Sequence, residues 1–134
     1  MAERLRLALI AHDGCKPRMV QWVERHRRAL GCCRLFATGT TGGRIAERCP
    51  ELDVTRLQSG PLGGDLQVGA LIVDKQIDAM VFFVDALSAM PHDVDVKALM
   101  RVAVLCDVLF ALNEITAECL LASLFPTFTT GDNQ

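Results

Sequence analysis

The feature that most constrains the fold of this chain is a regular alternation of short apolar runs with stretches of helical period. The run Ala79–Val84 is wholly apolar and has the length of a buried strand. Further along, apolar residues recur with the i, i+3, i+4, i+7 spacing of one helix face, at Val96, Leu99, Met100 and Ala103. Strands that alternate with helices are typical of parallel sheets. The sequence therefore predicts a single α/β domain, with a doubly wound parallel sheet and helices on both faces.

Five strands are predicted along the chain, each followed by a helix. The predicted strands are Leu5–Ala11, Cys33–Ala37, Val54–Leu57, Ala79–Val84 and Val108–Ala111. The predicted helices are one that opens at Pro17 with the stripe Met19, Val23, His26 and Leu30, then Thr40–Arg48, Asp65–Lys75, the segment around Val96–Ala103, and Thr116–Leu124. We expect residues 1–124 to form the domain and residues 125–134 to form a short C-terminal tail.

Composition excludes several classes of protein. The chain has 14 Lys and Arg against 16 Asp and Glu, which argues against a surface built to bind nucleic acid. No apolar run approaches the roughly 20 residues that a spanning helix needs, and the longest, Val102–Leu112, contains Asp107. The apolar run Leu7–Ala11 is too short for a signal peptide. We therefore expect a cytoplasmic protein that spans no membrane.

The cysteines do not indicate a disulfide framework or a zinc ribbon. The chain has 6 Cys without a Cys-x-x-Cys pair, and Cys32 and Cys33 are adjacent, which is a poor geometry for a disulfide. We expect reduced and mostly buried thiols.

Polar and glycine-rich segments follow the predicted strands. In an open parallel sheet the ligand binds beyond the carboxyl ends of the strands. The segments at those ends are His12–Lys16, Thr38–Gly43, Ser59–Asp65 and Asp85–Asp95. Nearly all of the candidate chemistry therefore falls on one rim of the predicted sheet.

The second and third of these loops are suited to an anion. Their glycines let the backbone approach a ligand, and the helices that follow present unpaired N–H groups. Lys16 supplies a full positive charge, whereas neither a Walker A loop nor a Gly-x-Gly-x-x-Gly motif is present. The alternative is that both loops are tight turns capped by threonine.

The acids and histidines of the rim suggest proton transfer beside a carbonyl group. Such chemistry needs a base at carbon and an electrophile at oxygen. Asp65 is a candidate base, and His92 with Asp95 could polarise the carbonyl or relay a proton. His12 and Asp13 form a second pair. Alternatively, an Asp at a helix start is an ordinary N-cap.

Two other functions for rim residues are less favoured. Cys15 lies near His12 in the sequence, but an unactivated thiol is more often a core filler than a nucleophile. His12, Cys15, His92 and a carboxylate do not have the spacing of a closed zinc site, so no metal is predicted. We treat His26 as structural or exposed.

Four motifs together resemble those of the methylglyoxal synthase family, in order and with compatible spacing from about Leu7 to Ala117. They are Ala-His-Asp with Lys16, the run Ala37–Gly42, the run Ser59–Asp65, and the run Pro91–Leu99. The resemblance implies a homohexamer, the strand order 3-2-1-4-5, and no metal or organic cofactor. It also implies a lyase that converts dihydroxyacetone phosphate to methylglyoxal and inorganic phosphate through an enediolate.

The resemblance also implies a role for each rim residue. Asp65 matches the catalytic base, His92 matches the residue that contacts the substrate oxygens, and the supporting carboxylates match Asp95, Asp13 and Asp85. The residues that match the family's substrate or phosphate contacts are His12, Lys16, Thr38, Gly39, Thr40, Thr41, Ser59 and Gly60.

The sequence departs from the family pattern at three places. Leu66 stands where a glutamine usually follows the base, Leu112 replaces a threonine, and no Lys or Arg follows Arg101. Some relatives offer a tail arginine to a neighbouring subunit's phosphate, so phosphate binding here would depend on Lys16 and backbone donors. The alternative function is a non-catalytic module of the same fold that senses a phosphorylated metabolite.

Overall fold

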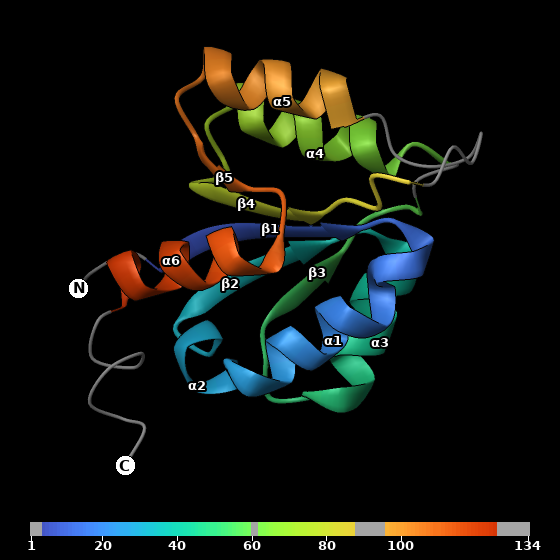
Figure 1. Ribbon diagram of the computed structural model, residues 1–134, viewed down its shortest axis with the longest axis vertical. Helices are drawn as coiled ribbons and strands as arrows, with labels where there is room; N and C mark the ends of the chain where they lie inside the picture. Colours follow the sequence, from blue (N-terminus) through green and yellow to red (C-terminus); the bar gives the residue numbers. More distant parts are fainter. Residues whose placement is uncertain (1–3, 60–61, 88–95, 126–134) are drawn as a thin grey trace.

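The five strands form one parallel sheet in the order β3-β2-β1-β4-β5, as the resemblance implied (Figure 1). A computed structural model describes residues 4–59, 62–87 and 96–125 of the chain. The strands are β1 (Leu5–Ala11), β2 (Cys33–Ala37), β3 (Val54–Arg56), β4 (Ala79–Phe83) and β5 (Leu109–Ala111). The helices are α1 (Lys16–Arg25), α2 (Arg27–Leu30), α3 (Gly39–Arg48), α4 (Gly64–Val73), α5 (Val96–Leu105) and α6 (Glu114–Leu124), with a 3-10 turn η1 (Asp13–Cys15).

Helices cover both faces of the sheet. In Figure 1, α4 and α5 lie on one face, and α1, α2, α3 and α6 lie on the other. The central strand β1 contributes alternate side chains to the two cores, with Leu7 and Leu9 in one and Ala8 and Ile10 in the other. Because both faces are covered, strands of this kind are apolar throughout, which explains the high hydrophobic fraction of 51%.

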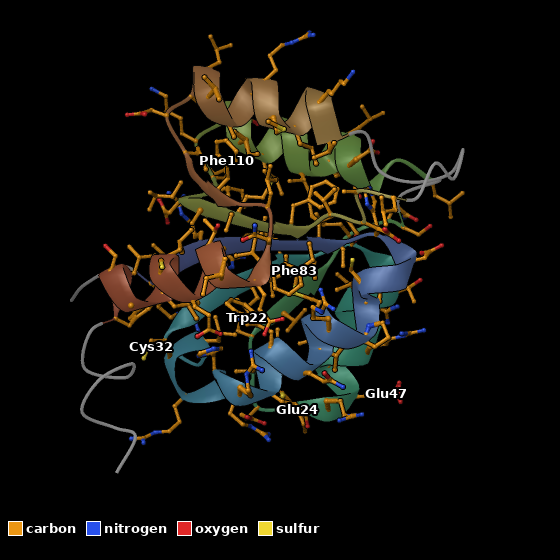
Figure 2. The ribbon with its side chains drawn as sticks, viewed as in Figure 1. Trp22, Glu24, Cys32, Glu47, Phe83 and Phe110 are labelled. Carbon is orange, nitrogen blue, oxygen red and sulfur yellow. The ribbon has the colours of Figure 1, made fainter. Side chains whose placement is uncertain are left out.

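The larger core lies under α1, α3 and α6 and is organised around Trp22. The Trp22 ring is fully buried, and it packs edge-on against Phe83 with 5.9 Å between ring centroids. Figure 2 shows Phe83 between the sheet and Trp22, whereas Phe110 lies on the α4 and α5 side. Phe125, the last described residue, packs against this same core.

One predicted helix is divided in the structure. The expected stripe ran through His26, but α1 ends at Arg25 and α2 begins at Arg27, because His26 has the non-helical angles φ −110° and ψ 23°. The His26 Nε2 atom lies 2.8 Å from a carboxylate oxygen of Glu118 in α6. The prediction of a structural role is consistent with this contact, whereas the prediction of one continuous helix was wrong.

The expectation of mostly buried thiols was also wrong. All 6 cysteines are free, but only Cys33 and Cys49 are buried, while Cys32 and Cys119 are exposed. Burial raises the pKa of the Cys33 thiol to about 12. Within the described segments, no helix has both the length and the apolar character needed to cross a membrane.

Candidate active site

The first and fourth rim loops meet at His12. This residue follows β1, is only 7% exposed, and accepts at Nδ1 a hydrogen bond of 2.9 Å from the backbone N–H of Asp85. The ring also packs edge-on against Phe82, with 5.1 Å between centroids. A Cβ atom on Gly14 would lie 3.0 Å from an Asp85 carboxylate oxygen, so a glycine at this position lets the loops approach closely. The structure thus brings His12 together with Asp85, whereas the sequence predicted a shared rim and paired His12 with Asp13.

The first loop also holds an ion pair. Lys16 begins α1, and its Nζ atom lies 2.8 Å from the Asp13 carboxylate. This hydrogen bond, together with the charge of Lys16, lowers the pKa of Asp13 below its ordinary value. Arg44 of α3 contributes a smaller effect of the same sign. In this structure the Asp13 carboxylate is therefore the ion-pair partner of the Lys16 ammonium group.

The second loop ends at the amino terminus of α3, which faces the rim. Thr38 is the N-cap, but its side chain makes no capping hydrogen bond. The first N–H of the turn, that of Gly39, bonds the Gln58 carbonyl at 3.2 Å, and that of Gly42 bonds the Thr38 carbonyl at 2.7 Å. Among the described residues, no acceptor is recorded for the N–H groups of Thr40 and Thr41 between them. Two unpaired N–H groups at a helix amino terminus form a site for an anion.

The side chains of this turn differ in exposure. Thr40 is exposed, whereas Thr41 is fully buried and its hydroxyl has no hydrogen-bond partner within the described part of the chain. A buried hydroxyl without a partner is unfavourable and rare. Because this hydroxyl is closed off from solvent, an anion at the start of α3 could become its partner only through a small shift of the turn.

The third loop packs directly on the second. A Cβ atom on Gly39 would lie 2.9 Å from the Ser59 nitrogen. A Cβ atom on Gly64 would lie 2.0 Å from the Gln58 carbonyl oxygen and 3.0 Å from the Thr38 methyl group. Both positions therefore require glycine. α4 begins at Gly64, so the start of this helix, with Asp65 as its second residue, lies close to the Thr38 side chain.

The glutamine that follows Asp65 also links two parts of the rim. The Gln67 side-chain oxygen accepts a hydrogen bond of 2.7 Å from the backbone N–H of Gln58. Leu66, which replaces the other glutamine of the family pattern, is 74% exposed. The sequence thus retains the glutamine that holds the third loop against α4.

Asp65 is half-buried at the edge of a groove. This groove of about 360 Å³ lies between α4 and α5 and is lined mainly by apolar side chains, including Leu66, Leu99 and Val102. The predicted site residues Gly60, His92 and Asp95 lie outside the described residues. Among the described residues, no group of three or more His, Cys, Asp or Glu side chains is placed to hold a metal ion.

Sequence reasoning missed Arg56 as part of this rim. It is the last residue of β3, and its Nη2 atom donates a hydrogen bond of 3.1 Å to the Gly39 carbonyl oxygen. A charged residue that ends a strand just before a glycine-rich loop was the available signal.

Comparison with known proteins shows the family to which this chain belongs. The family model for the MGS-like domain matches residues 18–112. The chain is 54% identical to a methylglyoxal synthase of Allorhizobium ampelinum over 121 residues, which are 90% of this chain and 96% of that protein. The chain belongs to the methylglyoxal synthase family. A second family member, from Rhizobium rhizogenes, is 56% identical over 118 residues, covering 88% and 94% of the two chains.

A solved structure of the methylglyoxal synthase family has the same fold. The crystal structure of methylglyoxal synthase from Elizabethkingia anophelis superposes with a TM-score of 0.87 at 44% identity. The match covers 97% of this chain and 84% of that chain. The likeness to methylglyoxal synthases therefore extends over nearly the whole chain, which favours the lyase over the sensing module.

Proposed function

We propose that this chain is a lyase that converts dihydroxyacetone phosphate to methylglyoxal and inorganic phosphate. The observation that carries the proposal is the packing of Gly64 against Thr38. This close approach supports the proposal, because Asp65 directly follows Gly64 and the start of α3 has N–H groups without a partner among the described residues. A base next to an anion site suits a substrate whose acidic carbon lies a few bonds from its phosphate.

The reaction proceeds in three steps. Asp65 removes a proton from the hydroxymethyl carbon, and the electron pair of the broken C–H bond forms an enediolate with the neighbouring carbonyl. The enediolate then breaks the C–O bond to phosphate, and inorganic phosphate leaves with that bonding pair. The resulting enol takes up a proton at carbon and becomes methylglyoxal. Asp65 carries a proton after the first step and returns it before the next turnover.

Each remaining site residue has a proposed role in these steps. We assign stabilisation of the developing oxyanion to His92, with a second donor from His12. Lys16, Thr38, Gly39, Thr40, Thr41, Ser59 and Gly60 hold the phosphate or other parts of the substrate. Asp13, Asp85 and Asp95 are supporting carboxylates.

The rim selects elimination over isomerisation by fixing one torsion angle. Phosphate leaves the enediolate only when its C–O bond stands across the plane of the π system. Threonine and glycine donors that grip the phosphate oxygens would hold this bond out of the plane, so binding and selectivity come from the same groups.

The test is release of methylglyoxal and phosphate by the purified protein. We expect Asp65→Asn to lower kcat by about 10³-fold or more while leaving folding and phosphate binding intact. Asp74→Asn, at the other end of α4, is the matched control and should retain activity. Wild-type protein that binds phosphate tightly but releases no methylglyoxal over a broad pH range would instead be the sensing module.

Three further features belong to the proposal. We propose a homohexamer located in the cytoplasm, with residues 125–134 as a tail beyond the domain formed by residues 1–124. Light scattering of the purified protein tests the hexamer, and removal of residues 126–134 with retention of activity tests the tail.

A further inference from the structure

Arg56 lies across the first turn of α3, on the side of the helix next to β3. Its Nη2 atom donates to the Gly39 carbonyl oxygen at 3.1 Å. That carbonyl belongs to the peptide unit that joins Gly39 to Thr40. The arginine therefore bonds the same peptide plane that carries the Thr40 N–H, which has no hydrogen-bond partner among the described residues. The orientation of this N–H group therefore depends on where the guanidinium holds the carbonyl.

Two glycines make room for this arginine. A Cβ atom on Gly43 would lie 3.0 Å from Nη2 of Arg56 and 3.1 Å from Cζ, and a Cβ atom on Gly42 would lie 3.0 Å from Cγ. Glycine is a poor helix former, so a glycine pair inside the first turns of α3 costs stability. The space that the pair provides is occupied by the arginine side chain, which accounts for Gly42 and Gly43 in physical terms.

We propose that Arg56 is a positioning residue that sets the phosphate-binding turn by holding the Gly39 carbonyl. This inference rests on the proposed function in that it takes the start of α3 as the phosphate site. Arg56 acts through the peptide between Gly39 and Thr40, not through contact with the reacting atoms. Its positive charge beside the turn adds to the attraction for an anion.

The expected effect is on binding. Loss of one exposed hydrogen bond that orients the turn should raise the Kd for inorganic phosphate and the KM for dihydroxyacetone phosphate by about fivefold. The turnover number should stay within about twofold, because Asp65 and the oxyanion donors are unchanged.

Two single variants and their combination test the proposal. Arg56→Met keeps the aliphatic stem and removes the guanidinium, whereas Gly43→Val keeps the arginine but places methyl groups where the guanidinium lies. Because both changes break the same contact, the double variant should be no worse than either single variant. Arg48→Met is the matched control: Arg48 ends α3 in an exposed pair with Glu24, 2.8 Å away, and should leave Kd and KM unchanged.

Phosphate binding is measured by calorimetry on the whole chain, and KM and kcat by methylglyoxal release. Unchanged Kd and KM in Arg56→Met, a loss confined to kcat, or fully additive effects of the two changes would overturn the proposal. Wild-type protein that binds phosphate without turnover would refute only the proposed lyase function, not the role of Arg56. In that case a fivefold weaker phosphate affinity in Arg56→Met would still support the positioning role.

Discussion

The Nδ1 atom of His12 accepts a hydrogen bond of 2.9 Å from the backbone N–H of Asp85. A backbone N–H is always a donor, so Nδ1 must present a lone pair, and the imidazole is neutral with its hydrogen on Nε2. The backbone of the fourth loop, at Asp85, thus fixes the tautomer of His12 in the first loop. His12 can then donate from Nε2 to a substrate oxygen without carrying a charge.

The first prediction separates these two roles of His12. In His12→Asn the amide oxygen can replace Nδ1 as acceptor, so the free energy of unfolding should fall by no more than about 1 kcal/mol. The Nε2 donor is lost, and kcat/KM should fall about 10²-fold. Chemical denaturation and methylglyoxal release measure the two quantities. His12→Ala should lose both the Nδ1 acceptor and the Nε2 donor, so its stability and its kcat/KM should both fall. If His12→Asn were as active as wild type, the Nε2 donor would not be used in the reaction.

The second prediction concerns the unpaired hydroxyl of Thr41. Thr41→Val replaces this fully buried hydroxyl with a methyl group of similar size. Removal of an unsatisfied polar group should raise the free energy of unfolding by about 1 kcal/mol. If a bound phosphate supplies the missing partner, the Kd for phosphate should rise about tenfold. A more stable variant with unaltered phosphate affinity would contradict this role for the hydroxyl.

The third prediction compares two glycines in α4. Gly64→Ala would put a Cβ atom 2.0 Å from the Gln58 carbonyl oxygen, so the third loop must move away from Asp65. We expect a loss of about 2 kcal/mol or more in stability and a large loss of activity. Gly69→Ala meets only Leu99, at 3.8 Å, and should gain up to about 1 kcal/mol from helix propensity. Thermal unfolding and turnover are measured for both variants. Similar stability and activity of Gly64→Ala and Gly69→Ala would contradict the prediction.

The fourth prediction concerns pH. Arg6 donates three hydrogen bonds to the Asp78 carboxylate. Its guanidinium bonds each oxygen at 3.1 Å, and its backbone N–H bonds one of them at 2.8 Å. These hydrogen bonds lower the pKa of the Asp78 carboxyl. A lowered pKa in the folded state stabilises the fold above the ordinary carboxyl pKa of 3.8, and this stabilisation is lost as the pH falls through the folded value.

We therefore expect Asp78→Asn to cost about 1 kcal/mol at neutral pH, allowing for solvent screening of a partly exposed pair. The difference from wild type should shrink as the pH falls below about 4. Denaturant unfolding at several pH values measures it. Asp53→Asn, which removes a more exposed pair with Arg4, is the control and should change stability little. A constant difference down to pH 2 would rule out this linkage.

Local pattern was sufficient to predict the five strands and most of the helices. The apolar run of β4 and the helical spacing of α5 each depend on residues close in sequence, so their periods can be read directly. The positions of the glycine-rich loops followed from one general rule about the carboxyl ends of parallel strands. Even the strand ends differed by only a residue, as at β3, which ends at Arg56 rather than Leu57.

Contacts between distant residues could not be read in this way. The break at His26 accompanies a contact with Glu118 in α6, and the tautomer of His12 depends on Asp85 in another loop. Cys119 is exposed because α6 buries Ala117, Leu120 and Leu121 instead, and Cys32 is exposed in the turn before β2.

A doubly wound sheet with polar loops beyond its strands could be predicted from the chain alone, because periodicity and loop chemistry are local properties. The tertiary structure alone decided that Arg56 reaches the Gly39 carbonyl and that Gly64 lies against Thr38. The physical reason is that these contacts need β2 and β3 to be neighbours and the loops to pack within ångströms, which periodicity does not encode.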